Sequence, residues 1–290
     1  MVSISDRDCV SFLQANLPKL HLRWAGYRKV RRQVRKRLQR RLEELGFEDL
    51  SDYTQFLQAH TYEWQNLEQY CRITISRFYR DRQIFETLRH EVLPHLAQEA
   101  GDTLRLWSAG CASGEEAYSL ALIWHLELAA QFPQLHCQLL ASDSNPAMLA
   151  RAERAIYRAG ALKELPSCWR ETAFRQYVPV DFDHSQSNSR TDSHQSSITS
   201  LWELKPSYRA DVQFVVHDLR TAPPAGSFHL ICCRNLAFTY FDLPLQQQVL
   251  QLLLSALMPG GVLVIGGHEQ LPANELLPWS NSRGIFCKQR

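Results

Sequence analysis

The spacing of apolar residues divides the chain into a helical first part and a longer second part in which strands alternate with helices. Up to about residue 70, apolar positions recur at helical spacing over the segments 5–17, 26–46 and 49–59. This pattern is typical of amphipathic helices with one buried face, so it predicts a small helical bundle at 1–70. We expect the remainder, 71–290, to form a second and larger domain.

The second part contains short apolar runs of strand length, most of them followed by a helical pattern. Strands are predicted around 104–107 and at 137–142, 213–217, 228–232 and 262–265, helices at 147–157 and 244–257, and a turn at 259–261. Strands and helices that alternate in this way form a mostly parallel, doubly wound α/β sheet of the Rossmann-like kind. Such sheets bind their ligand at the carboxyl ends of the strands, so the residues that follow each strand are the candidates for a binding site.

The segment 106–123, LWSAGCASGEEAYSLALI, reads as a buried strand, a turn of small residues and the start of a helix. Gly110 and Gly114 allow a tight turn and a close approach of the backbone to a ligand. Glu116 stands at the helix start, where a phosphate-binding loop would carry a Lys, so the ligand is expected to bear cationic or hydroxyl groups. S-adenosylmethionine fits this expectation, because it carries a sulfonium, an amino group and a ribose diol. Asp143 follows the next strand, where nucleotide-binding α/β units place an acid that accepts the ribose hydroxyls.

A polar segment interrupts the alternation of strands and helices. Residues 181–200, DFDHSQSNSRTDSHQSSITS, are rich in Ser and nearly devoid of apolar residues, which predicts a flexible loop. The flanking segments 174–180 and 201–208 have strand character. Together they predict a small β excursion at about 170–212, which either binds a partner or covers an edge of the sheet.

The middle helix of the first part is strongly basic. Nine Arg or Lys residues and no acid lie between Arg28 and Arg41, although the net charge of the whole chain is only +2. A basic helix face is either simply solvated or a docking surface for an acidic partner. For the second reading the candidate residues are Arg28, Arg32, Arg35 and Lys36. Nucleic acid is the less favoured partner, because no recognition module and no base-flipping motif accompanies these charges.

The composition is that of a cytoplasmic enzyme. No apolar run approaches the length of about 18 residues that spans a membrane, and the polar start of the chain does not resemble a signal peptide. The eight cysteines are scattered without CxxC spacing, so we expect reduced thiols rather than disulfides or a zinc site. The eleven histidines are equally dispersed, and no metal is expected.

Five segments follow one another in order along nearly the whole chain. They are ITISRFYRDRQIFETL (73–88), WSAGCASGEEAYSLA, ASDSNPAMLARAERAIY, CRNLAFTYFD (233–242), and LMPGG followed by GGHEQLP. Together they resemble the CheR-type chemotaxis-receptor methyltransferase family. Members of that family use S-adenosylmethionine to form methyl esters on glutamate side chains of receptors. The resemblance implies an acidic protein substrate, presented as a helical receptor segment. In that family the β excursion is a small antiparallel subdomain.

The resemblance also assigns roles to individual residues. It implies that the cofactor is bound by a set of residues spread over these segments, namely Thr74, Ser76, Arg80, Gly110, Gly114, Glu116, Asp143, Asp218, Leu219, Cys233 and Arg234. Arg80 and Tyr240 are the residues it implies for catalysis. The chain differs from the family pattern at Thr74 and Asp218, where the family has Asn, and it has one additional residue before Tyr240. Thr239 is therefore the alternative occupant of the catalytic tyrosine's place.

The implied chemistry makes modest demands. A glutamate carboxylate is ionised at neutral pH, so it attacks an activated methyl group without a general base and needs only alignment. Arg80 is expected to hold a carboxylate, either that of the substrate or that of the cofactor, and Tyr240 to orient the nucleophile through a hydrogen bond. Two other functions remain open. One is a methyltransferase of this fold that acts on nucleic acid or a small molecule, and the other is a cofactor-binding regulator without catalysis.

Overall fold

The computed structural model describes residues 4–178, 200–280 and 282–290. Contacts divide the chain into two compact units. Unit 1 comprises Met1–Ile75, Asn235–Gln251 and Glu269–Ala273, and unit 2 comprises Ser76–Arg234, Leu252–His268 and Asn274–Arg290. Unit 1 thus combines the N-terminal part with two short segments from far along the sequence. The domain division predicted from the sequence, 1–70 and 71–290, stays a prediction.

Unit 1 is built of helices. Ser5 caps the first helix by accepting from the amide of Asp8, and Asp49 caps another by accepting from the amides of Ser51 and Asp52. The helices at 5–17 and 49–59 are therefore confirmed. The helix predicted at 26–46 is wrong in extent, because the chain leaves the helix after Tyr27 and begins a new one at Arg31. The elements are α1 (Asp6–Asn16), η1 (Leu17–Leu20), α2 (Trp24–Tyr27), α3 (Arg31–Leu45), α4 (Leu50–Ala59), α5 (Glu63–Cys71) and α11 (Ala237–Tyr240).

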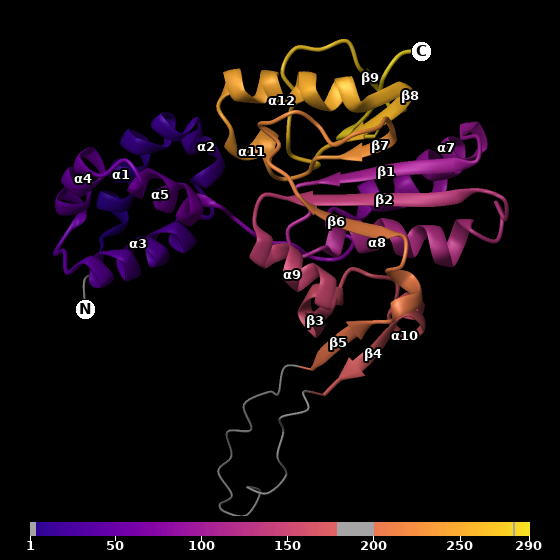
Figure 1. Ribbon diagram of the computed structural model, residues 1–290, viewed down its shortest axis with the longest axis horizontal. Coiled ribbons are helices and arrows are strands. Elements are labelled where there is room, and N and C mark those ends of the chain that lie inside the picture. Colours follow the sequence, from indigo (N-terminus) through magenta and orange to yellow (C-terminus); the bar gives the residue numbers. More distant parts are fainter. Residues whose placement is uncertain (1–3, 179–199, 281) are drawn as a thin grey trace, which may run out of the picture. The chain divides into compact units, whose positions relative to one another are not determined.

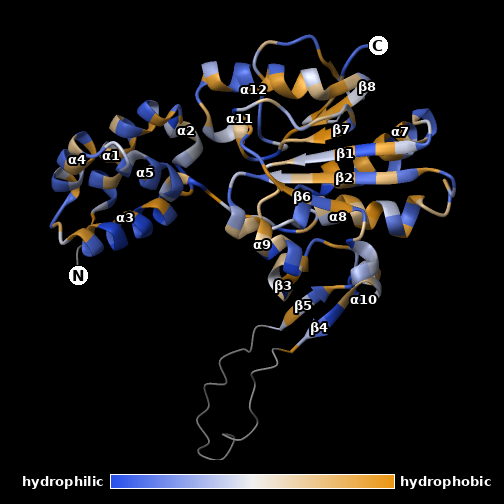
Figure 2. Ribbon diagram, in the orientation of Figure 1, coloured by the Kyte–Doolittle hydropathy of each residue, from blue (hydrophilic) through white to orange (hydrophobic). Residues whose placement is uncertain are grey.

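The apolar side of α3 forms part of the core of unit 1. Val34, Leu38 and Leu42 are fully buried, at the spacing of one helix face, and pack in one cluster with Tyr53 of α4. Much of α3 is blue in Figure 2, because the other faces carry the basic residues. Gly46 ends the helix in the left-handed conformation at φ 71°, where a glycine is favoured.

The segment around α11 belongs to unit 1 although it lies more than 150 residues from the other helices in the sequence. The amide of Arg23 donates to the carbonyl of Tyr240 at 2.8 Å, and Leu22 forms an isolated antiparallel bridge with Phe241. The guanidinium of Arg23 also donates to the carbonyl oxygen of Thr239 at 2.9 Å. These contacts attach the predicted catalytic segment to the helical bundle.

Unit 2 contains a seven-stranded sheet in the order β6-β2-β1-β7-β8-β10-β9. Figure 1 shows β6, β2, β1, β7 and β8 following one another in this order. The pairs β6–β2, β2–β1, β1–β7 and β7–β8 are parallel, and β10 joins β8 and β9 in antiparallel fashion. The strands are β1 (Thr103–Ala109), β2 (His136–Asp143), β6 (Val212–Val216), β7 (Phe228–Cys232), β8 (Leu257–Val264), β9 (Leu277–Pro278) and β10 (Ile285–Cys287).

The strand order shows where a ligand is expected to bind. From β1 the chain moves outward to β2 and β6, and then crosses to β7 and β8 on the opposite side of β1. The order therefore reverses between β1 and β7, and open α/β sheets bind ligands at the carboxyl ends of the strands beside such a switch point. The predicted mostly parallel, doubly wound sheet is confirmed.

The helices of unit 2 contribute to a single large core. In α8 nearly every residue is buried, including Leu120, Leu122 and Ile123, and its closest strand neighbours are β1, β2 and β6. The helices are α6 (Arg82–Thr87), η2 (Leu88–Val92), α7 (Leu93–Glu99), α8 (Glu115–Ile123), η3 (Trp124–Leu128), α9 (Pro146–Arg154), η4 (Ala159–Leu162), α10 (Ser167–Ala173) and η6 (Pro206–Tyr208). A further helix, α12 (Leu243–Ala256), is divided between the two units.

A separate antiparallel sheet in the order β3-β5-β4 contains the β excursion predicted at about 170–212, together with β3, which lies before that range and was not predicted. It consists of β3 (Ile156–Arg158), β4 (Phe174–Tyr177) and β5 (Leu201–Leu204). The helix predicted at 147–157 is too long, because α9 ends at Arg154 and Ala155 turns the chain at φ 52° into β3. The Ser-rich segment 181–200 lies, apart from Ser200, outside the described residues.

The C-terminal part differs in two respects from the sequence prediction. Gly260 and Gly261 were expected in a turn, but they lie within β8, where the pairing with β7 is irregular. Strands β9 and β10 were not predicted, since each is only two or three residues long.

Among the described residues, no helix combines the length and the apolar character needed to cross a membrane.

Candidate functional site

The loop after β1 is a compact turn that is tied to the end of β2. The amides of Gly110 and Cys111 both donate to the carbonyl of Ser142 at 2.8 Å. Gly110 and Gly114 have φ values of 86° and 89°, and a Cβ on Gly114 would lie 2.8 Å from that of Ala152. A larger residue at Gly114 would therefore be strained both by its conformation and by packing. The loop delivers the chain directly into the N-terminus of α8, as predicted.

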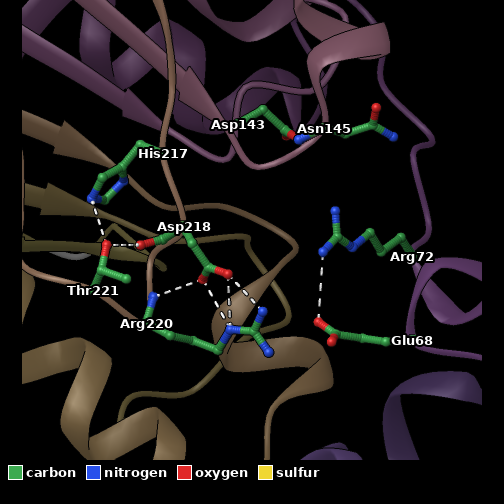
Figure 3. A network of polar contacts seen from close by, with 8 residues as sticks. All are labelled: Glu68, Arg72, Asp143, Asn145, His217, Asp218, Arg220 and Thr221. Atoms are coloured by element: carbon green, nitrogen blue, oxygen red, sulfur yellow. Dashed lines mark hydrogen bonds and ion pairs between the residues drawn. The ribbon is translucent and has the colours of Figure 1, made fainter. Parts of the chain in front are cut away.

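Asp143, the last residue of β2, closes this loop. One carboxylate oxygen accepts from the amide of Ala112 at 2.9 Å, and the other accepts from the amide of Asn145 at 2.9 Å. Figure 3 shows Asp143 and Asn145 side by side at the end of the strand. A carboxylate offers about four acceptor positions, so two backbone bonds do not by themselves exhaust it. The acid thus organises the loop and retains the chemistry needed to accept hydroxyl groups.

Glu116 and Arg234 are brought together, although 118 positions separate them in the sequence. Arg234 Nη1 donates to Glu116 Oε2 at 3.0 Å, while Ser108 Oγ donates to Glu116 Oε1 at 2.7 Å. Arg234 Nη2 donates to Asp81 Oδ2 at 3.0 Å and also to the carbonyl of Arg80. The two predicted cofactor residues therefore form one ion-paired cluster with the segment that precedes α6.

This cluster is buried. The side chain of Arg234 is only 2% exposed, and its guanidinium lies over the ring of Phe85 at 4.9 Å. Burial by itself lowers the pKa of the guanidinium, but the neighbouring charges of Glu116 and Asp81 raise that pKa above its ordinary value. Arg234 is therefore a permanent positive charge at the carboxyl end of β7.

The segment before α6 joins this cluster through its backbone, since the carbonyl of Arg80 accepts from Arg234 Nη2. The amide of Phe78 donates to the carbonyl of Ala161 at 3.0 Å, and the amide of Tyr79 donates to Ser119 Oγ at 3.1 Å. Tyr79 and Asp81 have positive φ values, 55° and 62°, on either side of Arg80. Left-handed residues on both sides of Arg80 make a tight turn, and Ser76 begins this segment.

Asp218 follows β6, and its carboxylate accepts from the backbone amide and from the guanidinium of Arg220, the latter at 2.6–3.1 Å. Figure 3 shows this pair beside His217, whose ring contacts the hydroxyl of Thr221. Leu219 is 7% exposed and Cys233 is fully buried, with its amide bound to the carbonyl of Val264 at 2.8 Å. All these residues lie at carboxyl ends of strands in unit 2.

Thr74 and Tyr240 belong to unit 1, so their predicted contacts with the cofactor stay predictions. The ring of Tyr240 packs on that of Tyr27 at 5.0 Å and is mostly buried. The hydroxyl of Thr239, the alternative residue, donates to Glu269 Oε1 at 2.6 Å. The other oxygen of Glu269 accepts from the amide of Asn235 at 2.7 Å, so this acid holds the α11 segment in place.

The basic helix is partly neutralised by its neighbours. Arg31 and Arg35 lie 2.8 and 3.6 Å from the carboxylate of Asp6 in α1, and Arg41 forms an ion pair with the buried Glu63 of α5 at 2.7 Å. The sequence shows no acid between Arg28 and Arg41, but the acids are supplied by other helices. Five members of the basic set are exposed, whereas Arg35 is directed into an ion pair; the exposed ones are Arg28, Lys29, Arg32, Lys36 and Arg40.

Six of the eight cysteines are buried, as expected for a packing role, whereas Cys287 is half-buried and Cys168 is exposed. All eight are free, and burial raises the pKa of the Cys111 and Cys232 thiols well above the ordinary value. These groups therefore stay neutral and are poor nucleophiles. Within the described parts of the chain, no group of three His, Cys, Asp or Glu side chains could hold a metal ion.

Sequence reasoning missed two acids that hold predicted site segments, Asp81 in unit 2 and Glu269 in unit 1. Both lie in segments that had been singled out for other residues, Asp81 directly after Arg80 and Glu269 directly after His268. In each case the sequence contained a signal for the residue, since an acid stands within a segment that resembles the family pattern. Its partner could not be identified because both acids bind residues far away in the sequence.

Two family models match the chain. Residues 74–283 match the CheR methyltransferase, SAM binding domain, and residues 29–70 match the CheR methyltransferase, all-alpha domain. A chemotaxis protein methyltransferase from Listeria monocytogenes is 35% identical over 69% of this chain and 66% of its own length. One from Klebsiella aerogenes is 31% identical over 82% of this chain and 75% of its own length.

One similar solved structure is that of the N-methyltransferase NodS from Bradyrhizobium japonicum in complex with S-adenosyl-L-homocysteine. Its sequence is 19% identical, the match covers 62% of this chain and 61% of the NodS chain, and the TM-score is 0.31. A likeness that low adds nothing on function. The match to the SAM binding domain extends over well more than half of the chain and includes every predicted cofactor residue from Thr74 to Arg234. The chain therefore belongs to the CheR methyltransferase family.

Proposed function

We propose that this protein transfers a methyl group from S-adenosylmethionine to glutamate side chains of a protein substrate, a receptor of the chemotaxis type. The observation that carries the proposal is the loop at 110–114, which Asp143 closes at the carboxyl end of β2 within the matched SAM binding domain. The relatives named chemotaxis protein methyltransferase support the class of reaction. The receptor glutamate as acceptor is inferred from the family.

The residues present suit this cofactor. Asp143 supplies acceptor oxygens for ribose hydroxyls, and Glu116 supplies negative charge for a cationic ligand. Leu219, buried after β6, supplies an apolar surface of the kind that suits an adenine ring. An acidic donor set of this kind suits S-adenosylmethionine better than a phosphate-bearing nucleotide.

The proposed mechanism depends on positioning. The cofactor supplies a methyl group on sulfur, so that one C–O bond forms while the C–S bond breaks and its electron pair stays on sulfur. Because the attacking carboxylate is already ionised, the protein needs to align it and needs no base. Arg80 binds a carboxylate through its forked donors, and Tyr240 orients the nucleophile by donating a hydrogen bond.

The substrate is proposed to be acidic and helical, and the reaction to take place in the cytoplasm. The exposed cations Arg28, Arg32 and Lys36 on unit 1 complement a glutamate-rich helix. The free cysteines agree with a reducing compartment, because oxidising compartments favour disulfides.

The decisive experiment combines the purified protein, methyl-labelled cofactor and cytoplasmic fragments of receptors from the same genome. We expect label on the receptor fragment that is released as methanol by mild base, since a carboxylate ester is base-labile. Receptor fragments with Gln in place of the candidate Glu residues are the matched control and should stay unlabelled. A base-stable product, or labelling of nucleic acid or small molecules instead, would reject the proposal. Cofactor binding with no turnover on any acceptor would favour a regulator.

A further inference from the structure

The guanidinium of Arg234 pairs with two carboxylates. It meets Glu116 Oε2 through Nη1 and Asp81 Oδ2 through Nη2, each at 3.0 Å. A guanidinium paired with a single carboxylate forms a neutral unit. Arg234 carries a single positive charge, so by itself it cannot neutralise both carboxylates.

The cluster lies in surroundings where its charges have a long reach. The side chains of Arg234, Glu116 and Asp81 are 2%, 14% and 28% exposed. The ring of Phe85 covers one face of the guanidinium. Water screens such a cluster much less than it screens a surface ion pair, so its charges act on any ligand beside Glu116.

We infer that the charge of Asp81, acting through Arg234, strengthens binding of the positively charged cofactor but not of its neutral product. The inference rests on the proposed function, because it assumes that the ligand beside Glu116 is S-adenosylmethionine. In that molecule the sulfonium and ammonium outweigh one carboxylate, for a net charge of +1. S-adenosylhomocysteine lacks the sulfonium charge and is neutral.

Asp81 has this effect without being a ligand itself. If Asp81 were neutral, the charge of Glu116 would be fully balanced by Arg234, and the cation would meet a neutral pair. Asp81 binds a different nitrogen of the same guanidinium, so the positive charge of Arg234 is shared between the two acids. The negative charge of Glu116 is therefore only partly balanced by Arg234. Asp81 thus sets the electrostatics of the pocket through another residue.

The test is Asp81→Asn, which removes the charge and keeps the size and an acceptor oxygen. Asn also tolerates the left-handed conformation that Asp81 adopts at φ 62°. Calorimetry on the full chain should show affinity for S-adenosylmethionine reduced on the order of tenfold, whereas affinity for S-adenosylhomocysteine changes less than about twofold. Glu127→Gln is the matched control, because Glu127 is also 28% exposed and also pairs with an arginine, Arg89. It should leave both affinities unchanged.

Two more variants separate charge from structure. Asp81→Glu retains the charge, so it should preserve the ratio of the two affinities even if both decline. If Asp81→Asn does not fold, Asp81→Gly also removes the charge, suits the left-handed backbone and should show the same selective loss. Equal losses for both ligands, or no loss, would overturn the inference while leaving the proposed function intact. A parent protein that binds neither ligand would refute both.

Discussion

Replacing Asp143 with Ala should weaken cofactor binding and loosen the loop after β1. The carboxylate accepts from the amides of Ala112 and Asn145, each at 2.9 Å, and is proposed to accept from the ribose hydroxyls as well. Hydrogen bonds to a charged group contribute about 1.5–3 kcal/mol each. Losing the ribose contact should therefore cost about 1.5–3 kcal/mol of binding free energy, which is roughly a 10- to 150-fold rise in Kd.

Loss of the two amide contacts should appear separately, as lower stability. Both amides are only part-buried, so water replaces some of the lost bonding, and we expect the free energy of unfolding to fall by about 1–3 kcal/mol. Calorimetric titration with S-adenosylhomocysteine measures the first effect and thermal unfolding without ligand measures the second. Asp143→Asn is the control, because it keeps one acceptor oxygen and should hold the loop better than Ala does.

The informative outcome is the combination of the two measurements. Reduced affinity with a stable loop places the effect on the ligand, as proposed. An Asp143→Ala protein that unfolds at a lower temperature but binds the product with parental affinity would show that Asp143 serves only the loop. That result would remove it from the ribose site.

Three further predictions concern catalysis, docking and stability. Arg80→Ala should nearly abolish ester formation, whereas Tyr240→Phe should cause a smaller loss of activity because the nucleophile is already ionised. If the Arg80→Ala variant formed the ester at the rate of the parent protein, the role of Arg80 would be contradicted. Replacing Arg32 and Lys36 with Glu should raise the apparent KM for the protein substrate and abolish the salt dependence of that KM, without changing cofactor affinity. If the variant kept the salt-dependent kinetics of the parent protein, this helix face would be merely solvated. Glu63→Gln should lower the free energy of unfolding by about 1–3 kcal/mol in urea titrations, since it weakens the charge-assisted hydrogen bonds between this fully buried acid and the guanidinium of Arg41. Burial raises the pKa of Glu63, but its hydrogen bonds outweigh burial and hold that pKa below the ordinary value. The stability that the ionised carboxylate contributes is therefore fully present above the unfolded pKa of about 4.3 and is lost as the pH falls through the lower folded pKa. The Glu63→Gln variant should lack this dependence of stability on acid.

The local sequence determines the elements whose pattern is complete within about twenty residues. The strand, turn and helix at 106–123 could be predicted because its apolar run, its glycines and its helix start are adjacent in the sequence. The same holds for Asp143 at the end of β2, since a strand followed by an acid is a local pattern. The helices capped by Ser5 and Asp49 were equally accessible, because a cap acts on the next few amides.

The tertiary structure decided every feature that depends on a distant partner. Arg234 was predicted to line the pocket, but only the fold shows that it joins Glu116 to Asp81, since ion pairs between strand ends leave no periodic trace in the sequence. No acid lies within the basic stretch of the sequence, whereas the fold places Asp6, 25 positions from Arg31, beside it. The short strands β3, β9 and β10 likewise exist because a neighbouring strand supplies their hydrogen bonds. Sequence specifies local conformation and burial, whereas pairing of charges and strands is settled only when the chain returns on itself.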